Sequence, residues 1–293
     1  MGKKTKNSAS RKKSMACREN KKGWNGIALL LAAVFLDLFL GGCARQRWSE
    51  KLNEEEVAGV AETIQRMQEE SKSCPNSFDA TALIFWKHPM EESAIEGYLQ
   101  LLAPSFFKFV INNPLGQPLY AISSNGRTFQ SLHIAQQKHI RGNIRSLALR
   151  NEILPILVSD NWFAYLSGRL PDRAVEIEEI NRDPASQTLW LHLANPGPER
   201  TTEKVYVHLA PAKREVLGYL ILDSKGATLA EISYKEEEGK GDRCLPRKNI
   251  AVTNLSWGAE FRIELKEIRT DIQLQEDDFG LPVPPGYATQ FQP

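Results

Sequence analysis

The side chains that most often perform catalysis do not form a known catalytic pattern in this sequence. It contains no His-Glu-x-x-His, Gly-x-Ser-x-Gly, phosphate-loop or Cys-x-x-Cys motif. The carboxylates of Glu176–Glu179 and Glu236–Glu238 have the pattern of solvated surface charge rather than of an acid–base pair facing one cleft. We therefore expect a protein that is not an enzyme and that has no catalytic residue.

Two histidines come nearest to a metal site. His192 and His208 lie in the similar apolar segments Leu189–Leu193 and Val205–Leu209, and they would share a face if these segments pair as strands. A zinc site needs at least a third protein ligand, and the spacing supplies none. We expect surface or half-buried histidines, with no metal and no cofactor.

Cys43 is the residue with the clearest chemical prediction. It follows a basic segment, the apolar run Ile27–Leu36 and the small residues Gly41 and Gly42. A basic region, a short apolar region and small residues before a processing point are typical of a secretory signal. The apolar run is shorter than the roughly 20 residues of a spanning helix, and Asp37 follows it.

The sequence Leu40-Gly41-Gly42-Cys43 resembles the bacterial lipobox. The resemblance implies a lipoprotein signal peptide at residues 1–42, cleavage before Cys43, and acyl chains such as palmitate on this cysteine. Two acyl chains already anchor a protein stably on a membrane that it does not span. By the same resemblance, Ala44 favours the outer membrane, on its periplasmic face. The alternative is an uncleaved anchor in which Cys43 is an ordinary thiol.

Two further questions about the cysteines and the start stay open. Cys74 and Cys244 would remain after processing, either as a disulfide in an oxidising periplasm or as two unpaired thiols. The basic region is long when counted from Met1, and Met15 is an alternative start.

Charge is distributed unevenly along the chain. The whole sequence has 37 Lys and Arg and 36 Asp and Glu, and nine of the basic residues lie within residues 1–42. The remaining 251 residues have a net charge of −6. A body of this sign has no basic surface for nucleic acid, so no nucleic-acid partner is expected.

The body begins with one predicted helix and continues mainly as strands. From Ser49 to about Ser71, apolar residues recur at helical spacing behind a cluster of glutamates that suits the helix N-terminus. Residues 147–170 predict two short helices, the second ending at Gly168. The remaining segments predict about eleven strands, at 80–87, 98–102, 106–111, 119–123, 128–134, 188–193, 204–209, 216–222, 227–234, 251–257 and 260–268.

These elements predict a mainly β protein with helices, an α+β fold built on one curved antiparallel sheet. Asn125-Gly126 marks a hairpin between two of the strands. The early strands are apolar at nearly every position, so both of their faces must be covered. Helices are one candidate cover, and an apolar ligand is another.

Three segments resemble parts of LolB, the outer-membrane receptor of the lipoprotein localisation pathway. Phe106–Tyr120 contains an apolar strand, the turn Asn113-Pro114-Leu115-Gly116 and a second strand. Ile84-Phe85-Trp86 lies where the family has an apolar-aromatic strand, and Trp162–Pro171 resembles a family helix that ends in Gly and Leu-Pro. The order and spacing match over roughly residues 78–270.

The resemblance implies a curved antiparallel half-barrel, closed by the N-terminal helix and the helical insert around an apolar cavity. In that family, the leucine of the turn is exposed and helps to pass lipoproteins into the outer membrane. Only Leu115 matches this position. Physically, Pro114 and Gly116 favour a tight turn that presents Leu115 to solvent, and the alternative is a Leu115 that folds back onto the sheet.

The expected organisation is therefore a signal peptide at 1–42, a lipid-anchored N-terminus with an amphipathic helix at 43–72, a LolB-like half-barrel at 73–270 and a Pro-rich tail at 271–293. Candidate cavity-lining residues are among Leu83, Phe85, Leu99, Phe107 and Val110, and strand parity alone does not tell which of these five face inward.

Two functions fit these expectations. The first is a carrier or receptor that binds the acyl chains of lipoproteins or another amphiphile and helps to insert them into the outer membrane. Its partners would be the membrane, the acyl ligand and a periplasmic LolA-like donor. The second is a structural or accessory envelope lipoprotein that uses the same sheet as a protein-binding surface. A continuous cavity would favour the first function, whereas a filled core with a buried Leu115 would favour the second.

Overall fold

The computed structural model describes residues 50–88, 90–144, 161–171, 177–194, 204–235, 243–255 and 258–292. All of them belong to one compact unit, Trp48–Pro293. The expected signal peptide and Cys43 lie outside the described residues.

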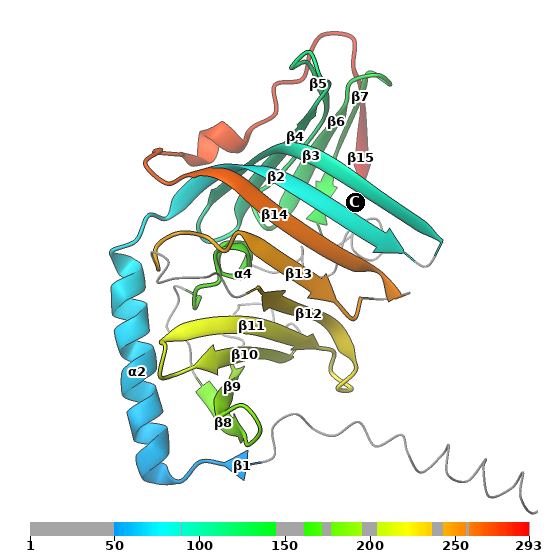
Figure 1. Ribbon diagram of the computed structural model, residues 1–293. Helices are drawn as coiled ribbons and strands as arrows, with labels where there is room; N and C mark the ends of the chain where they lie inside the picture. The colour runs from blue at the N-terminus through cyan, green and yellow to red at the C-terminus, as the bar shows by residue number, and fades with distance from the viewer. Residues whose placement is uncertain are drawn as a thin grey trace, which may run out of the picture. The chain divides into compact units, whose positions relative to one another are not determined.

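Fifteen strands form a single sheet in the order β1-β8-β9-β10-β11-β12-β13-β14-β2-β3-β4-β5-β6-β7-β15 (Figure 1). Every pairing is antiparallel except that of β15 with β7, which is parallel. The strands are β1 Glu50–Lys51, β2 Ser77–His88, β3 Glu91–Leu102, β4 Phe106–Asn112, β5 Pro118–Ser124, β6 Thr128–His133, β7 Lys138–Asn143, β8 Ile177–Asp183, β9 Thr188–Leu193, β10 Lys204–Ala210, β11 Glu215–Leu222, β12 Thr228–Tyr234, β13 Asn249–Thr253, β14 Glu260–Arg269 and β15 Ala288–Gln292.

The prediction of about eleven strands is too low, because β1, β7, β8 and β15 were not recognised. These four strands lie at the two edges of the sheet or next to them. Their sequences are short or polar, as in Lys-His-Ile-Arg-Gly-Asn for β7 and Ile-Glu-Glu-Ile-Asn-Arg-Asp for β8. Few of their side chains are buried, so they do not show the apolar alternation of the interior strands.

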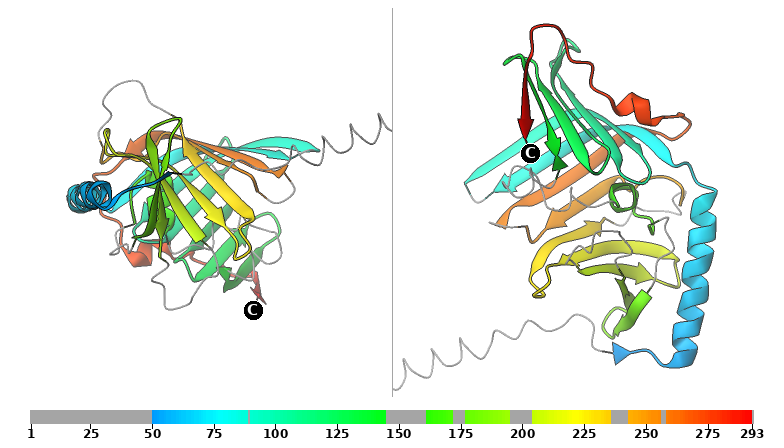
Figure 2. Two further views of the ribbon diagram at one scale, coloured as in Figure 1. Left: turned by 90° about the horizontal axis from the view of Figure 1, so that it is seen from below. Right: turned by 180° about the vertical axis from the view of Figure 1, so that it is seen from behind.

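The sheet is open and strongly curved (Figures 1 and 2). Helix α4, Trp162–Ser167, demonstrates the curvature. Phe107 of β4 contacts Trp162 at 5.6 Å between ring centroids, and Tyr219 of β11 contacts Tyr165 at 4.7 Å. Six strand spacings separate β4 from β11, which is about 29 Å on a flat sheet. A helix of six residues is only about 9 Å long, so the sheet must bend around it.

One face of the sheet forms the main apolar core. Strand register places Ala82, Leu99 and Phe107 on this concave face, together with Val207 and Ile232 from the other half of the sheet. All six residues of α4 are buried against it, and α4 ends at Gly168 in a left-handed conformation, as predicted. The first of the two helices predicted in 147–170 lies largely outside the described residues.

Helix α2, Glu54–Lys72, is the helix predicted from about Ser49. It begins later because residues 50 and 51 form β1, and Asn53 provides a capping box with Glu56. Ile64 is its buried apolar side chain, and Arg182 of β8 pairs with Glu56 at 2.6 Å. Among the described residues, no helix is long and apolar enough to cross a membrane.

A disulfide fastens the end of α2 to the other half of the chain. It joins Cys74 to Cys244, whose Cα atoms are 5.1 Å apart. The buried Arg169 side chain, just beyond α4, donates hydrogen bonds to the carbonyl oxygens of Pro75 and Cys244. The end of α2, the residue after α4 and the segment before β13 are therefore joined to one another at this end of the strands.

The C-terminal residues run across the convex face of the sheet and then join its edge (Figures 1 and 2). A 3-10 helix, η3 at Glu276–Phe279, lies against β4, and the buried Leu281 follows it. Strand β15 then pairs with β7. The segment expected as a Pro-rich tail thus contributes the last strand of the sheet.

Candidate functional site

The β4–β5 turn at Asn113–Gln117 places Leu115 in solvent. Its side chain is 84% exposed, so the alternative in which Leu115 folds back onto the sheet is wrong. The backbone N–H of Gly116 donates to the Asn113 carbonyl at 2.9 Å, and Gly116 has a φ of 77°. Glycine adopts this left-handed conformation without strain, so the turn is well defined.

The Asn113 side chain organises this turn. Its Oδ1 accepts hydrogen bonds from the backbone N–H groups of Leu115 and Gln117, each at 2.9 Å. Its amide nitrogen donates to the side-chain oxygen of Gln117 at 3.1 Å. Side-chain capping of this kind satisfies the backbone of a tight turn without any contribution from the side chain at the tip. The exposed side chain at position 115 is therefore not needed to form the turn.

A second turn in the same sheet supports this conclusion. Between β11 and β12, the Asp223 side chain accepts from the N–H groups of Lys225 and Ala227, each at 2.8 Å, and Gly226 has a φ of 85°. The hydrogen-bond pattern is that of the β4–β5 turn, but the tip residue is the exposed Lys225. The same backbone can therefore carry either a charged or an apolar tip.

Leu119 is a second exposed apolar side chain on this hairpin. It lies on β5 four residues beyond Leu115 and is 48% exposed. The sequence predicted a strand here. The exposure of Leu119 could not be read from the strand pattern, because β5 is exposed at its start and buried toward its end.

The structure divides the five candidate cavity residues between two faces. Leu99 and Phe107 are on the concave face and are buried in its core. Leu83, Phe85 and Val110 have the opposite parity on their strands and lie on the convex face, so of the five candidates only Leu99 and Phe107 face the concave side. The Arg262 guanidinium instead lies over Phe85, with its Cζ atom 5.7 Å from the centre of the Phe85 ring.

The concave face also carries exposed apolar side chains that were not among the candidate cavity-lining residues. Trp86 and Ile95, near the tip of the β2–β3 hairpin, are 42% and 41% exposed. Trp86 stacks on Phe261 of β14, with ring centroids 5.7 Å apart. Ile95 pairs with Ile84 across the two strands. Trp86 directly follows Phe85 in β2, so the two side chains point to opposite faces of the sheet. Only the strand register shows which of them faces the concave side.

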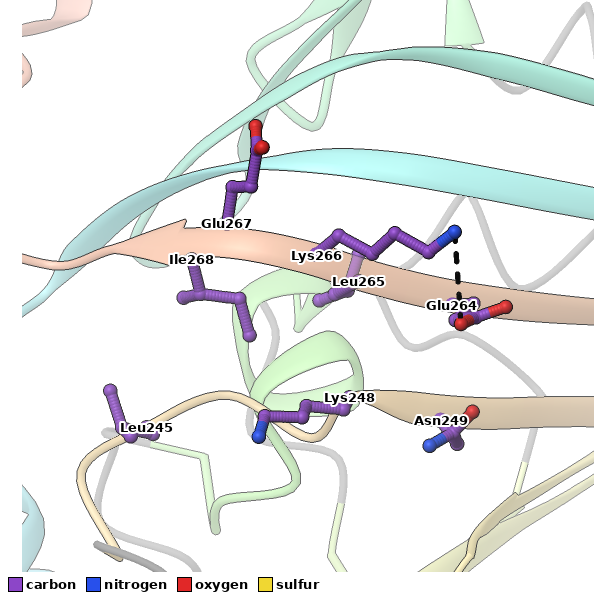
Figure 3. Close-up of a pocket in the computed structure, with 8 residues that line it drawn as sticks. All are labelled: Leu245, Lys248, Asn249, Glu264, Leu265, Lys266, Glu267 and Ile268. Atoms are coloured by element: carbon purple, nitrogen blue, oxygen red, sulfur yellow. Dashed lines mark ion pairs between the residues drawn. The ribbon is translucent and has the colours of Figure 1, made fainter.

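A pocket of about 410 Å³ lies where β14 separates from the start of β13 (Figure 3). Leu245, Leu265 and Ile268 provide its apolar lining. Two lysines and two glutamates surround it, and Lys266 approaches Glu264 at 3.9 Å, as the dashed line in Figure 3 shows. Because the charges balance, the pocket has no clear preference for a charged headgroup.

The two histidines lie on one face, as expected if their strands pair. His192 is opposite Tyr206 and His208 is opposite Trp190, and both imidazoles stack on aromatic rings of the neighbouring strand. His192 also lies 3.0 Å from a Glu178 oxygen. The described part of the chain contains no group of three or more His, Cys, Asp or Glu side chains that would hold a metal ion.

The fold is shared with solved bacterial proteins of low sequence similarity. One is a domain from Vibrio parahaemolyticus described as an outer membrane lipoprotein-sorting protein, with a TM-score of 0.55 and 19% identity over 78% of this chain and 97% of that one. The chain shares the fold of this lipoprotein-sorting domain.

Two further structures complete the comparison. A DUF1329 family protein from Desulfovibrio piger has a TM-score of 0.56 and 12% identity, over 76% of this chain and 96% of that one. The LolA superfamily protein NE2245 from Nitrosomonas europaea has a TM-score of 0.49 and 13% identity, over 74% and 97%, and the fold assignment does not depend on it. No protein-family model matches the sequence, and no curated protein matches it.

Proposed function

We propose that this protein is a lipid-anchored envelope protein that binds acyl chains of lipoproteins or of another amphiphile and helps to insert them into the outer membrane. In this proposal, Cys43 carries the anchor and a LolA-like periplasmic protein is the donor. The turn at Leu115 contacts the membrane during release. No covalent step is required, because the ligand moves by differences in affinity.

The exposure of Leu115 is the observation that carries the proposal. A large apolar side chain stands in water on a turn that does not need it, within a fold shared with a lipoprotein-sorting domain. Burial of one leucine in acyl chains is worth about 1.5–3 kcal/mol. This is enough to bias contact with a membrane without making it irreversible.

The exposed concave surface supports acyl binding. Trp86 and Ile95 offer apolar contacts on the inner side of the sheet, beyond the part that α4 covers. Ligand sites of this kind are mostly apolar and concave. We place the acyl chain along this end of the concave face.

The alternative function, a structural lipoprotein with a protein-binding sheet, has one observation in its favour. All six residues of α4 are buried on the concave side, so this part of the core is filled by the protein's own side chains. Lipid extraction of purified residues 44–293, followed by mass spectrometry, separates the two functions. Co-purifying acyl compounds support the carrier, and a protein that is free of lipid and does not bind a fluorescent fatty acid supports the alternative.

The contact with the membrane is tested by Leu115→Glu. In residues 44–293, which lack the acyl-carrying Cys43, we expect this variant to fold normally and to lose flotation with phospholipid vesicles, because a charge at the tip opposes insertion. The matched control is Lys225→Glu, which places the same residue at the tip of the equivalent turn and should float like the unmodified protein. Equal flotation of Leu115→Glu and the unmodified protein would remove Leu115 from the mechanism.

A further inference from the structure

The C-terminal segment, residues 272–292, contacts the hairpin that carries Leu115. It leaves β14 beside the start of β2, where the Ser77 hydroxyl donates to the Ile272 carbonyl at 2.9 Å. Figure 1 shows the segment passing along β4 and β5 to the end of the sheet where the β4–β5 turn lies, and then returning as β15 beside β7. The segment therefore runs along the hairpin that carries Leu115 and ends on the far side of it.

The first contacts are with β4. Phe279 is only 4% exposed, and its ring lies 5.5 Å from that of Phe106. The Lys108 ammonium donates to the Asp278 carbonyl at 2.8 Å. Phe106 and Lys108 alternate with the buried Phe107, so both of these contacts are on the convex face of β4.

The next contacts are with β5 and β6. The buried Ser123 hydroxyl donates a hydrogen bond to the Phe279 carbonyl. Leu281 forms a separate apolar cluster with Ala121 of β5 and Leu132 of β6. Val110, Ile134 and Tyr287 pack at the margin of this cluster. The β4–β5 hairpin is thus held between α4 on its concave face and the C-terminal segment on its convex face.

The end of the segment is fixed by backbone pairing. The Ala288 N–H donates to the Gln137 carbonyl at 2.9 Å, and β15 continues in register with β7 as far as Gln292 opposite Gly142. A Cβ at Gly142 would lie 2.0 Å from the Gln292 carbonyl oxygen, so the close approach of β15 requires glycine at this position.

We propose that residues 272–292 are a positioning brace that fixes the direction of the β4–β5 hairpin and therefore of Leu115. The membrane-contact part of this inference rests on the proposed function. The equivalent hairpin of β11 and β12 provides the contrast, because the brace contacts described above are all on β2, β4, β5, β6 and β7. The brace should accordingly affect one of the two matching turns and not the other.

Amide hydrogen exchange of the full-length chain, expressed in a Gram-negative bacterium and purified in mild detergent, tests the brace directly. In the double variant Phe279→Ala and Leu281→Ala, we expect at least fivefold faster exchange in 106–124 and unchanged exchange in 215–234. Unchanged exchange in both regions would overturn the proposal, and so would equal acceleration in both. If the double variant does not fold, Phe279→Leu is compared in the same way and should show a smaller acceleration, still confined to 106–124.

Vesicle flotation of the same substitutions in residues 44–293, which lack the acyl-carrying Cys43, separates the brace from the proposed function. We expect the brace variant to float at least threefold less than the unmodified protein, although its Leu115 is intact. Faster exchange in 106–124 with undiminished flotation would show that the brace does not position Leu115. Loss of Leu115 dependence in flotation would overturn the proposed function, while the exchange result would still decide whether the brace exists.

Discussion

Asn113 and Leu115 have different roles in the β4–β5 turn. The Asn113 side chain holds the backbone through two N–H groups, and Leu115 supplies an exposed apolar surface. Structure and surface chemistry are therefore separable by mutation at these two positions.

We expect Asn113→Ala to lower the free energy of unfolding by about 1 kcal/mol, because two backbone donors lose their acceptor. Membrane flotation should fall as well, since the tip is no longer fixed. Asp223→Ala in the equivalent turn is the control, and should cost similar stability without affecting flotation. Urea denaturation and flotation of both variants check this prediction, and identical flotation losses would contradict it.

A second group of residues holds β14 to β2. Asp79 is buried and accepts two hydrogen bonds from Arg269, at 2.8 and 2.6 Å, and one from the Tyr98 hydroxyl. Burial raises the pKa of Tyr98, and the neighbouring Asp79 carboxylate raises it further. The two partners differ in exposure, because the Arg269 side chain is 58% exposed and that of Asp79 only 3%.

This asymmetry predicts which substitution is worse. Asp79→Asn should lower the free energy of unfolding by about 1–3 kcal/mol. The loss stays in this range because a neutral amide keeps some of the hydrogen bonds. Arg269→Gln should cost more, since it leaves a buried carboxylate without a counter-charge. Urea denaturation at neutral pH ranks the two variants, and a larger loss for Asp79→Asn would contradict this explanation.

At the scale of elements, we expect the pairing of β15 with β7 to be sensitive to pH. His139 of β7 is buried, and its Nδ1 lies 3.3 Å from the Thr289 hydroxyl of β15. Burial lowers the pKa of His139, and the positive charge of Arg141 lowers it further. The folded protein therefore takes up a proton on this residue less readily than the unfolded chain does.

The consequence for stability follows from proton linkage. The contribution of neutral His139 should be complete above a pH of about 6.5, the usual histidine pKa, and should be lost as the pH falls below it. Burial and the charge of Lys138 also lower the pKa of His133, so it contributes in the same direction. We expect His139→Gln to reduce the loss of stability between pH 7.5 and 5.5, as measured by urea denaturation. An unchanged pH dependence would contradict this assignment.

The β2–β3 hairpin makes a separate prediction about ligand binding. Ile95→Gln removes an exposed apolar side chain from the concave face, and should weaken fatty-acid binding several-fold with little effect on folding. Leu83→Gln, on the convex face, is the matched control and should bind like the unmodified protein. Fluorescent fatty-acid titration of both variants measures the difference, and equal affinities would place the acyl site elsewhere.

Sequence patterns identified the interior of the sheet but not its edges. The apolar runs of β2, β4 and β11 predicted strands directly, and Asn125-Gly126 marked the observed hairpin between β5 and β6. The polar strands β7 and β8 were missed because few of their side chains are buried, so their sequences lack the apolar alternation of the interior strands. Inward and outward parity also needed the pairing register, so Phe85 was expected where Trp86 lies.

The same limit applies to the covering of β4. Its apolar residues on both faces correctly predicted that both faces are covered. The cover on the convex face is the C-terminal segment, which contacts β4 across a sequence separation of 170 residues between Lys108 and Asp278. No local pattern connects such distant residues, whereas the turn at Leu115 is local and was predicted from four consecutive residues.

At the scale of the whole unit, one continuous sheet wraps around α4, and a disulfide joins residues that are 170 positions apart. Closing so long a loop restricts the unfolded chain, which favours the folded form. The described unit is therefore constrained at one end of its strands, while the exposed tips with Leu115 and Trp86 lie toward the other end. This division suits a protein that contacts a ligand and a membrane at one rim.

Transfer of an acylated peptide to vesicles tests the central claim most directly. A fluorescent triacylated peptide is first bound to the protein, and its movement into phospholipid vesicles is then followed for the unmodified protein, Leu115→Glu and Lys225→Glu. We predict that all three bind the peptide, and that Leu115→Glu alone transfers it at least tenfold more slowly. Failure of the unmodified protein to bind the peptide, or equal transfer by all three, would contradict the account.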